Sequence, residues 1–123
     1  MYEPRLSINK LKRNEIKRLF EKGERVQIKN TKLYYLGNGL SISRFAILTP
    51  KKLGNAVYRN RVKRYFREAF RINQYKIKSH SDILILVSPD IKNTNFVTAE
   101  EILINLLNKA GIFINEKNCI RFD

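Results

Sequence analysis

The chain has 123 residues, of which 43% are hydrophobic and 11% aromatic, a composition that suits one packed domain and argues against wholesale disorder. Its 25 Lys and Arg against 11 Asp and Glu give a formal net charge of +14, so we expect a polyanionic partner, either nucleic acid or an anionic membrane surface. No apolar run approaches the roughly 20 residues of a spanning helix, which disfavours a membrane partner. The first residues lack a secretory signal and Cys119 is the one cysteine, which predicts a cytoplasmic location.

The N-terminal half predicts one helix and three strands. Residues 9–22 carry apolar side chains at helical spacing, and Gly23 is a suitable terminator. Alternating apolar and polar residues at 25–29 predict a half-buried strand, and 33–36 a second. Glycines at 37 and 39 offer the positive φ angles of a tight hairpin, which leads into a third strand at 42–49.

The C-terminal half predicts one interior strand between two helices. Residues 83–87 are apolar on both faces, as in the middle of a sheet. A capping box at 98–101 predicts the start of the last helix, and Gly111 its end. The predicted order is α-β-β-β-α-β-α, a single α+β domain over residues 1–123 with helices packed on a mixed four-stranded sheet. Residues 112–123 form either a small hairpin or a loose extension.

The segment 51–71 concentrates the positive charge. Apolar residues recur at helical spacing between its cations, so a helix docked by its apolar stripe would present a strip of fixed positive charge to phosphate. A solvated surface helix is the competing interpretation, although blocks of like charge usually serve a partner. The candidate RNA contacts are Lys51, Lys52, Arg59, Asn60, Arg61, Lys63, Arg64, Arg67 and Arg71.

The pattern K-K-x-G-N-A-V-x-R-N-R-x-K-R-x-x-R-E-A-F at residues 51–70 resembles the signature of the bacterial ribonuclease P protein component. The predicted elements also follow that family's order over about residues 5–111. The resemblance implies that the strand–helix–strand connection through this helix is left-handed, although about 98% of such crossovers are right-handed.

The same resemblance implies the function. The family's protein is one subunit of a ribonucleoprotein that removes the 5′ leader of precursor tRNA, and the RNA subunit with bound Mg²⁺ carries out the scission. The basic helix and its preceding loop would dock on that RNA. Ile16, Phe20 and Tyr34 would line the cleft for the single-stranded leader, with Ile16 where the family usually carries Phe.

The residues themselves predict neither a catalytic nor a metal site in this chain. His80 and Cys119 cannot assemble a zinc site alone, and no acidic residues have an evident reason to converge. Phe20 and Tyr34 have a competing interpretation as ordinary half-buried residues. The alternative functions are a structural ribosomal protein and a DNA-binding protein; the second is disfavoured because no helix-turn-helix pair is evident.

Overall fold

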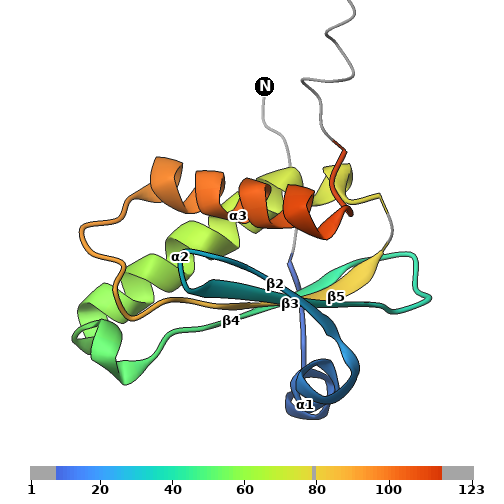
Figure 1. The fold of residues 1–123 in the computed structure, drawn as a ribbon, viewed down its shortest axis with the longest axis horizontal. Helices are drawn as coiled ribbons and strands as arrows, with labels where there is room; N and C mark the ends of the chain where they lie inside the picture. The colour runs from blue at the N-terminus through green and yellow to red at the C-terminus, as the bar shows by residue number, and fades with distance from the viewer. Residues whose placement is uncertain (1–7, 79, 115–123) are drawn as a thin grey trace, which may run out of the picture.

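A five-stranded mixed sheet separates one helix from two others in the computed structural model (Figure 1), which describes residues 8–78 and 80–114. The helices α2 and α3 cover one face of the sheet and the short helix α1 lies on the other. The elements are β1 (Asn9–Lys10), α1 (Arg13–Lys22), β2 (Glu24–Ile28), β3 (Thr31–Gly37), β4 (Arg44–Leu48), the 3₁₀ turn η1 (Lys51–Leu53), α2 (Ala56–Asn73), the 3₁₀ turn η2 (Gln74–Lys76), β5 (Ser81–Leu86) and α3 (Phe96–Ala110).

The strand order is β1-β4-β5-β3-β2, with β5 parallel to β4 and antiparallel to β3. The α+β class is confirmed, but the sheet has five strands and not four. The additional strand is β1, which pairs with β4 where the first helix was expected to begin. Helix α2 connects the parallel neighbours β4 and β5, and the hand of this crossover stays a prediction.

The prediction of a hairpin between the strands at 33–36 and 42–49 is wrong, because these segments, β3 and β4, are not paired. The tight turn lies earlier in the chain, between β2 and β3, where Lys29 and Asn30 take φ angles of 46° and 69°. Strand β5 separates β3 from β4, because a strand that is apolar on both faces loses the most water-exposed surface at the centre of the sheet. The connection after β3 is organised by Asn38, whose Nδ2 donates to the carbonyl of Ile42 at 3.0 Å.

The last helix begins at Phe96, two residues before the predicted capping box. Asn95 is its N-cap and accepts a hydrogen bond from the backbone N–H of Thr98 at 2.9 Å. The predicted end at Gly111 is confirmed, and this glycine takes the left-handed φ of 78°. Of the predicted tail 112–123, residues 115–123 lie outside the described residues, while Phe113 bridges Ile77.

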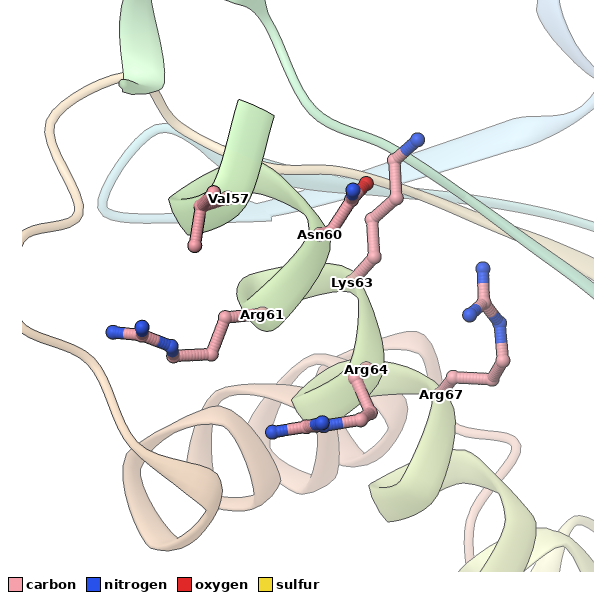
Figure 2. A pocket seen from close by; sticks show the side chains of 6 residues that line it. All are labelled: Val57, Asn60, Arg61, Lys63, Arg64 and Arg67. Carbon is pink, nitrogen blue, oxygen red and sulfur yellow. The ribbon is translucent and has the colours of Figure 1, made fainter. Parts of the chain in front are cut away.

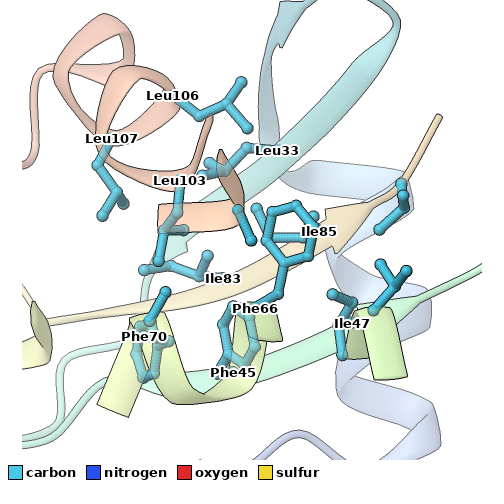
Figure 3. Close-up of a cluster of buried hydrophobic side chains, with 14 of the residues drawn as sticks. Leu33, Phe45, Ile47, Phe66, Phe70, Ile83, Ile85, Leu103, Leu106 and Leu107 are labelled. Atoms are coloured by element: carbon cyan, nitrogen blue, oxygen red, sulfur yellow. The ribbon is translucent and has the colours of Figure 1, made fainter. Parts of the chain in front are cut away.

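The main core lies between the sheet and helices α2 and α3 (Figure 3). Phe45 of β4 stacks on Phe70 of α2 with ring centroids 4.3 Å apart and planes 13° apart. A smaller core of Leu11, Leu19 and Leu84 holds α1 against the opposite face. Strand β5 therefore supplies side chains to both cores, as its unbroken apolar run predicted. None of the described helices combines the length and the apolar composition needed to cross a lipid bilayer.

Candidate nucleic-acid interface

The loop before α2 is shaped by Gly54 and capped by Asn55. Gly54 has a φ of 157°, and a Cβ there would lie 2.9 Å from Cδ2 of Tyr58. The side chain of Asn55 accepts from the backbone N–H of Tyr58 at 2.9 Å, which starts the helix. Buried Leu53 anchors η1, so that Lys51 and Lys52 remain exposed beside the beginning of α2.

Five polar and cationic side chains of α2 surround an open hollow of about 630 Å³ (Figure 2). We call this set of side chains the basic face. No described acidic side chain forms an ion pair with its four cations. Their charges are therefore uncompensated in the described part of the chain, and a row of phosphates would meet several donors at once. The basic face consists of Asn60, Arg61, Lys63, Arg64 and Arg67, with Val57 at its edge.

Two arginines that the sequence placed on the same strip have partners within the protein. The Nη1 of Arg59 donates to the carbonyl of Gly54 at 2.8 Å, which ties the loop to the first turns of α2. Arg71 is held by Glu68 through two hydrogen bonds of 3.0 and 2.5 Å. This pairing raises the pKa of Arg71, chiefly through the hydrogen bond to Glu68. Neither arginine lines the hollow.

The cations of the basic face separate onto two flanks of α2 (Figure 2). Arg61 and Arg64 extend to one side, and Lys63 and Arg67 lie on the other. Arg67 also lines a groove of about 170 Å³ that runs along β4 and includes Ile16 of α1. The basic face is therefore continuous with the groove between α1 and the edge of the sheet.

The other two predicted leader contacts meet on the α1 side of the sheet. Phe20 is 45% exposed, and its ring contacts Tyr34 of β3 edge-on with centroids 4.9 Å apart and planes at 72°. Tyr34 is half-buried beside Leu84 in the small core. The structure thus brings Phe20 and Tyr34 together, while Ile16 lies one helical turn away and borders the groove with Arg67.

The acidic residues near these surfaces have structural partners. Asp82 accepts from Arg44 and from Asn38, and Glu100 accepts from Nδ2 of Asn73 at 2.8 Å. Among residues 8–78 and 80–114, no three His, Cys, Asp or Glu side chains gather in a way that could hold a metal ion.

Sequence reasoning missed several features that depend on packing. Phe70 and Asn73 belong to the buried side of α2, whereas the periodicity predicted that the apolar stripe holds Val62, Tyr65, Phe66 and Ala69, with Tyr58 and Ile72 at its edges. The hollow that Phe96 shares with Arg64 and Tyr65 was not predicted, because Phe96 lies 31 positions after Tyr65 and the two meet only through the packing of α2 on α3. Helical periodicity to the last turn would have found Phe70.

An α+β fold with an unpaired cationic helix face, and with the exposed ring of Phe20 against half-buried Tyr34, has the features of a small basic nucleic-acid-binding protein. The cations supply attraction to phosphate without sequence preference, and the rings supply surfaces on which bases can stack.

Comparison with known proteins narrows this class to one family. The family model described as Ribonuclease P matches residues 8–111. The chain is 36% identical over 107 residues to the ribonuclease P protein component of Alkaliphilus metalliredigens, covering 86% of this chain and 96% of that protein. It is 37% identical over 106 residues to the ribonuclease P protein component of Syntrophomonas wolfei, which covers 86% of this chain and 89% of that protein.

Solved structures agree with the sequence relatives. The RNase P protein of Staphylococcus aureus superposes with a TM-score of 0.78 at 29% identity, covering 87% of this chain and 98% of that one. The RNase P protein of Thermotoga maritima gives a TM-score of 0.73 at 30% identity, covering 82% and 96%. The chain belongs to the ribonuclease P protein family.

Proposed function

We propose that this chain is the protein subunit of a bacterial ribonuclease P and assists the removal of the 5′ leader from precursor tRNA in the cytoplasm. The observation that carries the proposal is the basic face, five neighbouring donors on α2 inside a fold whose relatives are ribonuclease P protein components. The partners are the catalytic RNA subunit and precursor tRNA. Neither DNA nor a membrane has a part in this function.

The basic face is suited to docking on folded RNA. Arginine can grip a phosphate through two parallel hydrogen bonds, and Asn60 can bond phosphate or a 2′-hydroxyl. Exposed Lys51 and Lys52 extend this surface at the start of α2. Arg59 supports it indirectly by holding Gly54, which fixes the loop that carries the two lysines.

The α1 side of the sheet is suited to a single strand. The half-buried ring of Tyr34 and the exposed ring of Phe20 can stack on bases without reading sequence. Arg67 stands between this side and the basic face, so one RNA strand could pass from the leader cleft to the docking surface.

The chemical step belongs to the RNA subunit in this proposal. When bound there, Mg²⁺ would supply a metal-activated water for attack on the phosphodiester. The described residues of this chain position RNA, shield its phosphates from one another and bind the leader.

The proposal is tested with the RNA subunit of the same organism and a precursor tRNA at low Mg²⁺. Protein plus RNA should release the 5′ leader faster than RNA alone, and protein alone should leave the precursor intact. Equal cleavage with and without the protein would overturn the proposal, and so would robust cleavage by RNA-free protein. Co-purification with ribosomal subunits in place of a catalytic RNA would support the alternative of a ribosomal protein.

A further inference from the structure

The flank of α2 that faces α3 ends in a second hollow, separate from the groove on the α1 side. It has a volume of about 380 Å³, within the roughly 300–1,000 Å³ of sites for small organic groups. Its lining residues are Arg64, Tyr65 and Glu68 from α2 and Phe96 from α3, and we refer to it as the Tyr65–Phe96 hollow.

The two rings of this hollow are fixed in place and only partly covered. Tyr65 and Phe96 both pack against the main core, and each remains between buried and exposed. They come from two helices that contact each other along the core, so the hollow is preformed. A preformed pair of rings avoids the entropy loss of ordering side chains on binding.

The polar side chains of the hollow are also held. Glu68 is bonded to Arg71 through both carboxylate oxygens, which keeps this acceptor at the edge of the hollow. Arg64 lines both the basic face and the Tyr65–Phe96 hollow. Figure 2 shows Arg61 and Arg64 extending toward the flank on which α3 lies.

We propose that the Tyr65–Phe96 hollow receives one unpaired base of the RNA whose phosphates lie on the basic face. This inference rests on the proposed function, which supplies RNA as the partner. The shared Arg64 joins a phosphate-binding surface to an aromatic one, and adjacent phosphate and base sites are what one nucleotide requires. The charge of the neighbouring cations favours RNA over an apolar segment of another protein.

The carboxylate of Glu68 adds a preference among bases. It can accept a hydrogen bond but cannot donate one when ionised, so it favours a base with an exocyclic amino group. Adenine carries this group and no carbonyl oxygen, whereas the N3–H of uracil stands between two carbonyl oxygens that an ionised carboxylate repels. The hollow should therefore hold an unpaired adenine more tightly than an unpaired uracil.

The test uses two RNA hairpins that differ by a single bulged adenine, with binding followed by fluorescence anisotropy. The wild-type protein should bind the bulged hairpin about tenfold more tightly than the fully paired one. Phe96→Leu should abolish this preference and leave the salt dependence unchanged, because no phosphate contact is lost. Phe96→Tyr keeps a ring and should keep the preference. A wild-type protein with no preference, or Phe96→Leu with the full preference, would overturn the proposal.

Matched controls separate stacking from a general loss of structure. Tyr75 is 66% exposed and does not line the hollow. Tyr75→Leu therefore removes an exposed ring elsewhere and should leave the affinity for both hairpins unchanged. Thermal melts of each variant identify any loss of folding, and Tyr65→Leu provides a second test should Phe96→Leu unfold. A bulged uracil in place of adenine should weaken binding, and equal affinity for the two would remove the role assigned to Glu68.

The outcome is distinguishable from failure of the proposed function. Cleavage of precursor tRNA with the RNA subunit tests that function and does not depend on the hairpins. Normal stimulation of cleavage together with absent hairpin preference would refute the proposed base site in the hollow and leave the proposed function standing. Binding of an added apolar peptide that is lost in Phe96→Leu, together with absent hairpin preference, would instead indicate a protein partner and refute the RNA occupant.

Discussion

Arg44 holds Asp82 through two parallel hydrogen bonds, from Nε to Oδ1 at 2.7 Å and from Nη2 to Oδ2 at 2.8 Å. The two residues lie opposite each other on the parallel strands β4 and β5. The remaining donor, Nη1, reaches Glu15 of α1 at 2.6 Å. One guanidinium therefore fixes α1, the helix of the proposed leader cleft, to the centre of the sheet.

Replacement of Arg44 should destabilise the protein and loosen α1. In Arg44→Met the carboxylate of Asp82, 6% exposed, loses its main partner, and we expect the free energy of unfolding to fall by about 2–3 kcal/mol. Urea unfolding measures this change. Arg25→Met removes an exposed arginine and should cost under about 0.5 kcal/mol. The double variant Arg44→Met with Asp82→Asn should cost less than the sum of the single changes, and simple additivity would contradict the pairing.

Alanine at Arg61, Lys63 and Arg67 should weaken docking on the RNA subunit without unfolding the protein. Each lost phosphate contact should reduce the slope of log affinity against log salt by about 0.7–0.9. Filter binding over a series of salt concentrations measures the slope, and a thermal melt tests the fold. An unchanged slope would show that the basic face does not meet phosphate.

Arg59→Ala should behave differently from these variants. Because Arg59 donates to the carbonyl of Gly54, its loss should lower the melting temperature by more than Arg61→Ala does. One such hydrogen bond from a charged group contributes about 1.5–3 kcal/mol at most, and partial exposure reduces this. Equal melting temperatures for the two variants would mean that the loop is held without Arg59.

Removal of the rings on the α1 side should weaken binding of precursor tRNA selectively. Phe20→Leu and Tyr34→Leu should each lower the affinity of the holoenzyme for precursor about tenfold and leave mature tRNA nearly unchanged. Since Phe20 is 45% exposed, its replacement should cost far less stability than the roughly 3–5 kcal/mol of a core phenylalanine. Equal losses for precursor and mature tRNA would argue for a structural role.

Ile16 provides a gain-of-function counterpart. It is half-buried one turn from Phe20 and borders the groove with Arg67. Ile16→Phe introduces a flat ring at this border, and we expect tighter binding of precursor tRNA because a ring stacks on a base and a branched aliphatic side chain does not. Affinities for precursor and mature tRNA, measured side by side, test this expectation. An equal gain in affinity for both would exclude the leader as the cause.

Stability should decline at alkaline pH partly through Tyr35. Burial, followed by its hydrogen bond to Glu24, raises the pKa of Tyr35 above its usual value of 10.0. A raised pKa in the folded state gives stability that is complete below about pH 10 and is lost as the pH rises through the folded value. Tyr35→Phe should therefore show a shallower decline of the melting temperature above pH 10, and an identical decline would contradict the assignment.

The residues that act locally were readable from the sequence. The apolar stripe of α2 needs only a 3.6-residue period, and the ends at Gly23 and Gly111 need only a residue without a Cβ. At Gly23 the reason differs from the expected one, because its backbone is extended and a Cβ would lie 2.6 Å from the carbonyl oxygen of Leu19. The long signature at 51–70 was sufficient to predict the family, since it combines fixed spacing with the right element order.

Tertiary structure alone decided which strands are neighbours in the sheet. Strand β5 enters between β3 and β4 because burial of both its faces outweighs the short loop that would have joined the other two as a hairpin. The hydrogen bond from Arg59 to the carbonyl of Gly54 depends on loop geometry that no periodicity contains. The pairing of Arg71 with Glu68 could have been expected, because residues three positions apart on a helix are neighbours. The sequence by itself determined that a basic helix lies within an α+β fold. Packing against α1 and α3 determined which parts of the surface of α2 border a groove or a hollow. The sequence could not show this, because α1 and α3 reach α2 through contacts between residues distant in the chain.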